Sequence, residues 1–427
     1  MDVFRVEGGH RLSGSVAISG AKNSALKLMA ASLLVKGRTV LVNVPRISDV
    51  FTMCEVLEHL GATVDFEADV LSIDTSGEIT THAPYELVRR MRASINVLGP
   101  LLGRYGHARV AMPGGCNIGN RTIEIHERSL ELLGARFQFD HGDLEGVTAG
   151  LVGTRVVLDL PSRGATENLL TAAVLAKGET VIDNAAREPD IADLAEFLSG
   201  MGARIEGAGT STITIIGVDF LEPTAYRVPS DPIESGTLAL AVVASGGEAE
   251  LLGARPADLE IFLEKLSATG ATWEATSGGI RVGASRRPIS TDFATLPYPG
   301  FPTDLQPQMM AYLATCEGTS IVTENMFESR FLHVHELVRM GADARTEGHH
   351  AVVRGVPRLQ GAPVRASDLR AGAAIMIAAL GAEGTTDIYD IHHIERGYED
   401  LPGKLRRLGA HVERASGSVE SDRISVH

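Results

Sequence analysis

The chain repeats one short phrase six times: a leucine, three further residues, then Gly-Ala. The residue just before the glycine is apolar or threonine. The six pairs begin at Gly61, Gly134, Gly202, Gly270, Gly341 and Gly409. Successive glycines are separated by 73, 68, 68, 71 and 68 residues, a regularity that chance placement of the 46 glycines would not readily produce. The sequence therefore predicts a sixfold repeat.

Each copy of the phrase marks a place where a helix ends and a strand begins. The run before the glycine has helical spacing, and the residues after it alternate, as in Thr63-Val64-Asp65-Phe66. Glycine is common just past the end of a helix. A repeat of roughly 70 residues is longer than the 20 to 50 residues of common solenoid repeats. Each copy should therefore hold several strands and more than one helix, in a compact α/β unit.

Composition excludes several classes of function. A chain of 427 residues with 44% hydrophobic content is typical of a globular protein with room for two domains. The net charge of −15 argues against binding to nucleic acid. No apolar run is long enough to span a bilayer, and the first five residues do not resemble a signal peptide. We expect a cytoplasmic protein without nucleic-acid or membrane partners.

The six copies divide into two groups of three. Two prolines bracket a short polar turn at residues 228–232, between the third and fourth copies, which predicts a hinge. Residues 3–6 and 15–19 alternate like strands before the first repeat, and we expect them to complete the sheet of the second group. The predicted domains are therefore 1–21 with 230–427 (domain I) and 22–229 (domain II). Two crossings between domains predict a paired hinge and a cleft that closes on substrates.

The densest chemical signal is the loop from Pro113 to Arg121. It contains three glycines and Cys116, lies between a strand-like and a helical segment, and places an arginine five residues after the cysteine. Backbone N–H groups, a helix start and a nearby cation lower the pKa of a thiol, so Cys116 is predicted to be reactive. Cys54 and Cys316 lie in apolar runs with helical spacing, which predicts buried, inert thiols.

Seven motifs occur in order along the chain. They are Ser19-Gly20-Ala21-Lys22-Asn23-Ser24-Ala25, Met91-Arg92-Ala93-Ser94, the Cys116 loop, Ala186-Arg187-Glu188-Pro189, Pro297-Tyr298-Pro299-Gly300-Phe301-Pro302-Thr303-Asp304, Ser367-Asp368-Leu369-Arg370 and Glu395-Arg396-Gly397-Tyr398-Glu399. Together they resemble the motifs of the UDP-N-acetylglucosamine 1-carboxyvinyltransferase family of enolpyruvyl transferases. The resemblance extends from the first residues to about Ala410.

This resemblance implies a two-domain inside-out α/β barrel with three βαβαββ units in each domain, in agreement with the six repeats. It also implies a reaction. The enolpyruvyl group of phosphoenolpyruvate would move to the 3′-hydroxyl of UDP-N-acetylglucosamine with release of phosphate, at the start of peptidoglycan precursor synthesis.

The resemblance assigns roles to individual residues. Cys116 would protonate the methylene carbon of phosphoenolpyruvate, Lys22 and Arg121 would bind its phosphate, and Arg330, Arg370 and Arg396 its carboxylate. Arginine suits such contacts because its guanidinium binds oxyanions bidentately. Further substrate-binding positions implied by the resemblance are Asn23, Arg92, Thr122, Ile123, Glu124, Ile125, His126, Ser162, Arg163, Gly164 and Met326. Supporting positions are Asp49, Glu188, Asp231 and Asp368.

Asp304 has two interpretations. Its carboxylate could remove or orient the proton of the acceptor hydroxyl. It could instead cap the helix expected over residues 305–314. The sequence alone leaves both open.

Three departures from the family pattern fall on the nucleotide side. Thr122 replaces a proline and Glu124 an aspartate, Arg163 replaces a valine, and Pro232 replaces an arginine at the hinge. Thr122 lacks the fixed φ of proline, and Arg163 adds a cation where a diphosphate could pass. The departures keep a second hypothesis open, in which the same chemistry acts on another nucleotide or nucleotide sugar in secondary metabolism.

Metals and cofactors are not expected. His333 and His335 would share a face only in a strand, whereas residues 331–340 have a helical pattern, and the adjacent pairs at 349–350 and 392–393 are poorly spaced as ligands. The chain contains neither a Walker-type phosphate loop nor a G-x-G-x-x-G motif.

Two further hypotheses remain. One is transfer to shikimate 3-phosphate, on the related fold, although that branch lacks the Cys116 loop and does not resemble the chain at residues 20–23. The other is a catalytically silent nucleotide-binding relative. The joint presence of Lys22, Cys116, Arg121, Asp304 and Arg396 argues against a silent relative, which has no chemical need for all five.

Overall fold

The computed structural model describes residues 2–112, 114, 123–284 and 287–416, which form two compact units. Unit 1 comprises Met1–Ile18, Pro232–Leu296 and Phe301–His427, and unit 2 comprises Ser19–Asp231 and Pro297–Gly300. Unit 2 starts three residues before, and ends two residues after, the predicted range 22–229. The two connecting segments extend it because they pair with each other: Asp231 donates its N–H to the carbonyl of Ser19.

Unit 2 contains three four-stranded sheets. Their orders are β14(Ala225–Arg227)-β3(Arg38–Val42)-β5(Val70–Asp74)-β4(Thr63–Glu67), β6(His82–Ala83)-β7(His107–Ala111)-β9(Asp143–Val147)-β8(Arg136–Asp140) and β10(Arg155–Val157)-β11(Glu179–Asp183)-β13(Thr212–Ile216)-β12(Arg204–Glu206). The helices are α1(Lys22–Ala31), η1(Ser32–Leu34), α2(Ser48–His59), α3(Tyr85–Val88), η2(Arg92–Val97), α4(Leu98–Tyr105), α5(Glu124–Leu132), α6(Arg163–Ala173) and α7(Pro189–Gly200).

Unit 1 repeats this plan. Its sheets are β2(Ser13–Ala17)-β15(Glu248–Leu252)-β17(Gly279–Gly283)-β16(Thr272–Ala275), β18(Phe293–Ala294)-β19(Thr319–Thr323)-β21(His350–Arg354)-β20(Asp343–Glu347) and β22(Pro363–Arg365)-β23(Thr385–Tyr389)-β1(Asp2–Glu7)-β24(His411–Ser416). Its helices are α8(Pro232–Ala244), η3(Pro256–Asp258), α9(Glu260–Ala268), η4(Thr303–Leu305), α10(Gln306–Leu313), α11(Val334–Arg339), α12(Leu369–Gly381), α13(His392–Glu395) and α14(Leu401–Arg407). In all six sheets the first pair of strands is parallel and the others antiparallel.

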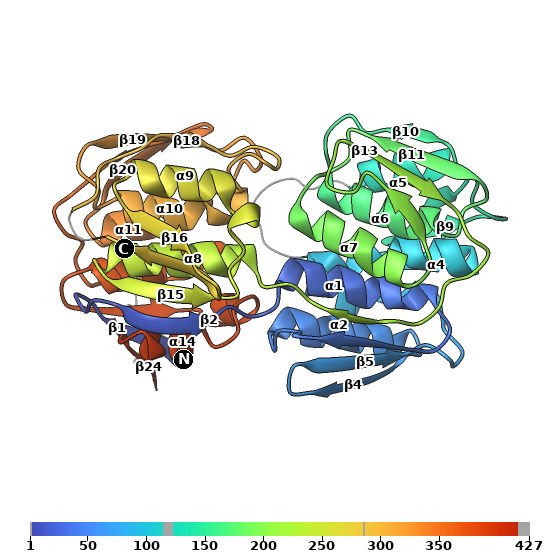
Figure 1. Ribbon diagram of the computed structural model, residues 1–427, viewed down its shortest axis with the longest axis horizontal. Helices are drawn as coiled ribbons and strands as arrows, with labels where there is room; N and C mark the ends of the chain where they lie inside the picture. The colour runs from blue at the N-terminus through green and yellow to red at the C-terminus, as the bar shows by residue number, and fades with distance from the viewer. Residues whose placement is uncertain (1, 113, 115–122, 285–286, 417–427) are drawn as a thin grey trace, which may run out of the picture. The chain divides into compact units, whose positions relative to one another are not determined.

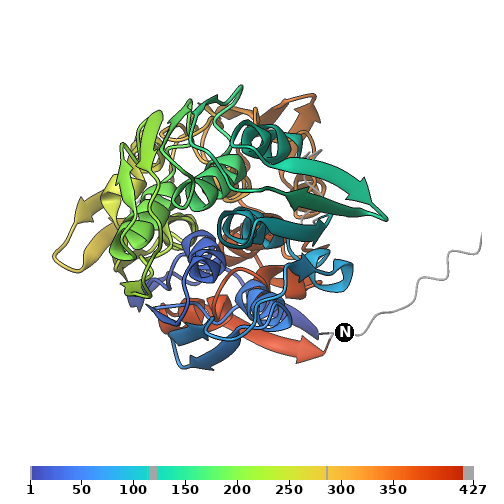
Figure 2. The same cartoon turned by 90° about the vertical axis from the view of Figure 1, so that its right-hand side faces the viewer.

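Helices form the centre of each unit and sheets its outside, so each unit is an inside-out α/β barrel (Figure 1). In unit 1, α8, α10 and α12 pack against one another, and every residue of α12 from Leu369 to Leu380 is buried. An apolar, alanine-rich helix such as α12 has no polar face, which is the pattern of a helix enclosed on all sides. Unit 2 encloses α1, α4 and α6 in the same way, and its helices are seen among surrounding strands in Figure 2. Within the described part of the chain, no helix combines the length and apolar character needed to cross a bilayer.

The repeated phrase is a helix C-cap. All six glycines have positive φ, from 86° to 105°, and each lies two residues after a helix and two before a strand. In the first copy the N–H of Ala62 donates to the carbonyl of Leu57, and the N–H of Gly61 to that of Glu58. This pair of bonds is the Schellman motif, with glycine at the left-handed position. The leucine, the glycine and the alanine of the phrase are therefore three parts of one local structure.

Both chain-start strands complete sheets of unit 1, as predicted. β1 lies between β23 and β24, and β2 pairs in parallel with β15. β2 covers residues 13–17 instead of the expected 15–19, because its pairing with β15 begins at Ser13 opposite Glu248 and ends at Ala17 opposite Leu252.

Charged groups buried in unit 2 are matched by partners. The ammonium group of Lys27 on α1 contacts the carboxylates of Glu167 on α6 and Asp190 on α7, and all three side chains are at most 7% exposed. Burial raises the pKa of Glu167, whereas Arg163 and Lys27 together outweigh burial and lower the pKa of Asp190. Removing one member of such a cluster would leave a buried charge uncompensated. The cluster therefore fixes α1 relative to α6 and α7.

A buried histidine joins α5 to α6. The ring of His126 is 6% exposed, and its Nδ1 accepts a hydrogen bond of 2.9 Å from the amide of Asn168. Burial, with a smaller contribution from the charge of Arg92, lowers the pKa of His126 from 6.5 to about 4. His126 is therefore neutral in the folded protein at neutral pH.

The repeat caps predict opposite effects for two glycines that lie two residues apart. Gly202→Ala should destabilise unit 2 by about 1–2 kcal/mol, because alanine disfavours the positive φ of 103° found there. Gly200→Ala, in the last turn of α7, should be neutral or stabilise by up to about 1 kcal/mol. The added methyl of Gly200→Ala meets Thr224 at an ordinary 3.5 Å, so steric overlap does not complicate the comparison. Urea unfolding of both variants measures the difference, and equal effects would contradict the cap.

The low pKa of His126 predicts a pH dependence of stability. Between pH 6.5 and about 4 the unfolded state binds a proton at this residue that the folded state does not, so stability falls as pH falls through this window. The loss from this group is about 3 kcal/mol at 1.36 kcal/mol per pKa unit. Free energies of unfolding for His126→Gln should therefore depend less steeply on pH than those of the parent. His141→Gln, at an exposed histidine of the same unit, is the matched control. An unchanged slope for His126→Gln would refute the assignment.

Candidate active site

Unit 1 brings three predicted site residues together around one carboxylate. Asp304 accepts hydrogen bonds from Arg330 at 2.9 Å and from Arg370 at 3.1 Å, one on each carboxylate oxygen. The arginine side chains are only 2% and 4% exposed, whereas Asp304 is 27% exposed. Two buried guanidinium groups thus converge on a carboxylate that solvent can reach. Such an arrangement suits the binding of small carboxylates.

Asp304 does not cap a helix, so that interpretation is wrong. It lies inside the short helix η4, and neither η4 nor α10 has a side-chain hydrogen bond at its N-cap. The two arginines take both oxygens of the carboxylate instead. The catalytic interpretation of Asp304 stays a prediction.

Other predicted residues of unit 1 lie around this cluster. Asp368 is the N-cap of α12 and accepts hydrogen bonds from the backbone N–H groups of Arg370 and Ala371. It therefore positions the first turn of α12, which carries Arg370; its supporting role in the site stays a prediction. Arg396 follows α13 directly and is partly exposed. His333 is fully buried and its Nδ1 lies 3.1 Å from the carbonyl oxygen of Arg330.

Sequence reasoning missed Glu324, which organises the loop beside this cluster. One carboxylate oxygen accepts from Thr295 and from the backbone N–H groups of Met326 and Phe327, and the other accepts from Thr303, next to Asp304. Glu324 is fully buried. Its importance could not be predicted from sequence, because the two hydroxyl partners, Thr295 and Thr303, come from another segment of the chain. Met326, a predicted site residue whose backbone N–H is bound by Glu324, is 36% exposed.

In unit 2, Lys22 begins the buried helix α1. Its ammonium group forms an ion pair of 2.7 Å with Asp49 of α2, and its backbone N–H donates to Asp231 at 3.2 Å. Both supporting carboxylates therefore hold Lys22, one by its side chain and one by its backbone. Asn23, the next residue, is partly exposed at the same helix start.

The start of α6 carries three predicted residues. Ser162 is the N-cap and accepts from the N–H of Ala165 at 3.4 Å. Arg163 forms an ion pair with Asp190 at 3.5 Å and keeps 37% of its side chain exposed. Gly164 lies against His126, since an added Cβ would come 2.9 Å from its ring. The ring of His126 therefore packs directly against the backbone of Gly164, in addition to its hydrogen bond with Asn168.

The remaining predicted residues are less connected. Ile123 is buried, Ile125 packs partly against the core, and Glu124 is exposed and lies 3.9 Å from Arg128. Arg92 begins η2 and is near enough to His126 to lower the pKa of that ring. Glu188 is at the N-cap of α7 without a side-chain cap bond. Cys116, Arg121 and Thr122 lie outside the described residues.

The two other cysteines are inert. Both are buried, and burial raises their pKa values to about 12, so both thiols stay protonated at neutral pH. Cys54 lies in α2, as expected. Cys316 was expected in a helix but lies three residues beyond α10, where its thiol donates to the carbonyl of Tyr312.

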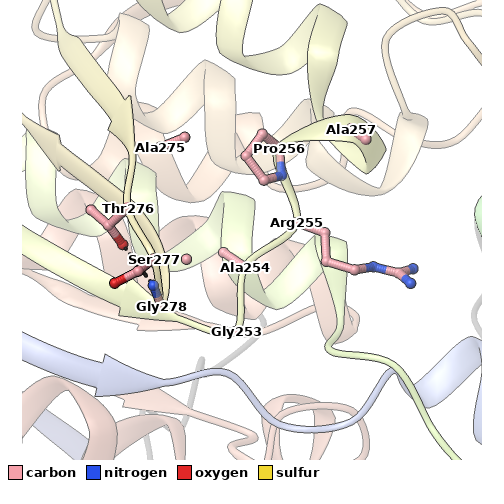
Figure 3. A pocket seen from close by; sticks show the side chains of 10 residues that line it. Gly253, Ala254, Arg255, Pro256, Ala257, Ala275, Thr276, Ser277 and Gly278 are labelled. Atoms are coloured by element: carbon pink, nitrogen blue, oxygen red, sulfur yellow. Dashed lines mark hydrogen bonds between the residues drawn. The ribbon is translucent and has the colours of Figure 1, made fainter.

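One open cavity of about 340 Å³ in unit 1 contains none of the predicted residues. It is lined by residues 253–257 and 275–279, and its one charged side chain, Arg255, points away from Thr276 and Ser277 (Figure 3). Arg255 pairs with Asp258 at 2.5 Å. Without a set of converging polar groups, this cavity does not resemble a substrate site.

Comparisons with known proteins place the chain in a family. The family model described as EPSP synthase (3-phosphoshikimate 1-carboxyvinyltransferase) matches residues 6–405. The chain is 51% identical to the UDP-N-acetylglucosamine 1-carboxyvinyltransferase of Corynebacterium jeikeium, with 97% of this chain and 99% of the relative covered. It is also 51% identical to the protein of the same name from Nocardia farcinica, with the same coverage.

Solved structures share the fold. The enolpyruvyl transferase NikO from Streptomyces tendae matches with a TM-score of 0.88 at 24% identity, covering 98% of this chain and 99% of NikO. EPSP synthase from Acinetobacter baumannii matches with a TM-score of 0.76 at 17% identity, covering 97% of this chain and all of the other. Because the family model spans most of the chain and the relatives match it along nearly its whole length, the chain belongs to the EPSP synthase family of enolpyruvyl transferases.

Proposed function

We propose that the chain transfers the enolpyruvyl group of phosphoenolpyruvate to the 3′-hydroxyl of UDP-N-acetylglucosamine and releases phosphate. The relatives at 51% identity carry the name of this activity, whereas the EPSP synthase structure is only 17% identical. The identities therefore favour the nucleotide sugar over shikimate 3-phosphate as the acceptor.

The observation that carries the proposal is the convergence of Arg330 and Arg370 on the carboxylate of Asp304. Two buried guanidinium groups carry two positive charges, and the partly exposed carboxylate of Asp304 balances only one of them. The remaining positive charge can attract a second carboxylate. The carboxylate of phosphoenolpyruvate is the proposed second ligand, with Arg396 as a third contact. Lys22 and Arg121 are proposed to bind the phosphate.

The proposed chemistry balances with the residues of the chain. Cys116 gives a proton to the methylene carbon of phosphoenolpyruvate, and the acceptor oxygen attacks the neighbouring carbon. Asp304 takes or orients the proton of the attacking hydroxyl. The tetrahedral intermediate then returns a proton from its methyl group to the thiolate of Cys116 and expels inorganic phosphate, which restores the double bond. These steps use no cofactor and no metal.

The nucleotide side of the proposed site consists of residues 122–126 and 162–164 with Asn23, Arg92 and Met326. Arg163 is the departure with a structural explanation, because it pairs with Asp190. The cation that it adds is matched within unit 2, so it need not demand an additional negative charge on the acceptor. This pairing favours the nucleotide sugar over a different acceptor from secondary metabolism.

The proposed setting is the cytoplasm, where the reaction would be the first committed step of peptidoglycan precursor synthesis. The proposed activity would thereby serve cell wall biogenesis and cell shape. Its partners would be the two small-molecule substrates.

Phosphate release tests the acceptor. Purified protein should release phosphate from phosphoenolpyruvate with UDP-N-acetylglucosamine and not with UMP or shikimate 3-phosphate, each offered separately. Cys116→Ser should lose this release but still bind UDP-N-acetylglucosamine, as measured by calorimetry. Release with UMP alone, or no release with any of the three acceptors, would refute the proposed activity. An unchanged Cys116→Ser would remove the thiol from the mechanism.

Replacing one buried guanidinium tests the carboxylate site. Arg330→Lys should raise the KM for phosphoenolpyruvate and lower kcat/KM by about 10- to 100-fold, because a charged hydrogen bond is worth about 1.5–3 kcal/mol. The lysine keeps the charge but loses the planar fork. Arg345→Lys, at an exposed position on β20 of the same unit, is the control and should change neither constant. An unchanged KM in Arg330→Lys would contradict the role of Arg330 in binding phosphoenolpyruvate.

A further inference from the structure

Two histidines and a glutamate meet at the edge of unit 1 where the chain-terminal strands pair. Glu7 is the last residue of β1, and His411, the first residue of β24, lies directly opposite it in the antiparallel register. His10 follows three residues after Glu7, and its ring stacks on that of His411 with centroids 3.7 Å apart and planes 22° apart. All three side chains are accessible, with 60% of Glu7, 35% of His10 and 57% of His411 exposed.

The backbone around these residues is fixed by hydrogen bonds. The N–H of Gly8 donates to the carbonyl of Gly384, and that of Gly9 to the carbonyl of Leu380 near the end of α12. Gly8 lies so close to α12 that an added Cβ would come 2.2 Å from the carbonyl oxygen of Ala382. Leu12, fully buried, anchors the chain on the other side of His10. The three side chains therefore project from rigid elements, as a preorganised ligand site requires.

The donor atoms lie at the spacing of metal ligands. Nε2 of His10 is 3.7 Å from one oxygen of Glu7, and Nδ1 of His411 is 3.1 Å from the other. One donor atom from each residue lies within 4.8 Å of the other two. Two ligands at tetrahedral positions on zinc, each about 2.1 Å from the ion, are about 3.4 Å apart. The two measured distances run to different oxygens of Glu7, so the side chains would rotate to bring one donor atom from each residue from within 4.8 Å to this spacing.

We propose that Glu7, His10 and His411 bind a divalent transition-metal ion of the zinc class. Two imidazole nitrogens and one carboxylate oxygen are ligands that suit zinc, and water would fill the remaining position. The site is separate from the residues proposed for catalysis, and the enolpyruvyl transfer does not require it.

Other surface histidines do not offer this set. His141 also contacts a carboxylate, that of Asp140 at 2.5 Å, but with a single imidazole. Within the described residues, no other three His, Cys, Asp or Glu side chains place their donor atoms this close together. This site could not be predicted from local sequence, because Glu7 and His411 are 404 positions apart.

A bound ion would join the two ends of the chain. It would connect β1 to β24 across their shared edge and hold the turn at His10 against both strands. Because the ligands are brought together only by folding, metal binding would stabilise unit 1 by mass action. The expected effect of the ion is therefore on stability, without a change in the transfer reaction.

Zinc titration of the full-length protein tests the site. Calorimetry with zinc chloride should show one ion bound per chain at this site, and zinc should raise the melting temperature, whereas magnesium chloride should not. His10→Ala and His411→Ala should each weaken this binding by more than about 100-fold, since loss of even the outer partners of metal ligands costs about 10- to 100-fold. Both positions are solvent-accessible, so their metal-free melting temperatures should stay near that of the parent.

Two further variants identify where the ion binds. His141→Ala is the matched control, because it removes an exposed histidine beside a carboxylate and should leave zinc binding unchanged. Cys116→Ser removes a thiol that could bind zinc on its own, and should also leave the site intact. Absence of zinc binding by the parent, or binding that is kept in His10→Ala and His411→Ala but lost in Cys116→Ser, would overturn the proposal.

Discussion

Each unit depends on enclosing helices on all sides within three sheets. The first N–H groups of a helix have no acceptor within the helix, and in an enclosed helix solvent cannot supply one. Polar partners must therefore lie at the start of such a helix. Several of the predicted site residues are found at these starts. They include Lys22 on α1, Ser162 and Arg163 on α6, and Asp368 and Arg370 on α12. The fold therefore places the chemistry of the chain where its architecture requires polar groups.

This placement suits the anions that the proposed reaction uses. The start of a helix carries partial positive charge and favours negative ligands. In this chain the helix starts are reinforced by full charges, which in turn are held by carboxylates. At the starts of α1 and α12, Lys22 is paired with Asp49 and Arg370 with Asp304. Cations positioned by carboxylates can stay in place without ligand and still attract a phosphate or a carboxylate.

Features encoded by short segments could be predicted from sequence. The Gly-Ala phrase gave the six helix ends, because one left-handed glycine and its neighbours form a complete cap. The alternation at residues 3–6 gave β1. Features that join distant segments could not be predicted. The pairing of Asp304 with two arginines, the burial of His126 against Asn168, and the meeting of Glu7 with His411 depend on tertiary contacts. The roles of Cys116 and Arg121 stay predictions that rest on family resemblance.

The pairing of Arg163 shows how a departure at a candidate site can be absorbed by the fold. Lys27 contacts two buried carboxylates, Glu167 and Asp190, and burial raises the pKa of Glu167. Arg163 brings a second cation to Asp190, and its charge is the largest influence that lowers the pKa of this carboxylate. Since an uncompensated buried charge is costly, this substitution is explained by the stability of unit 2 without any change of acceptor.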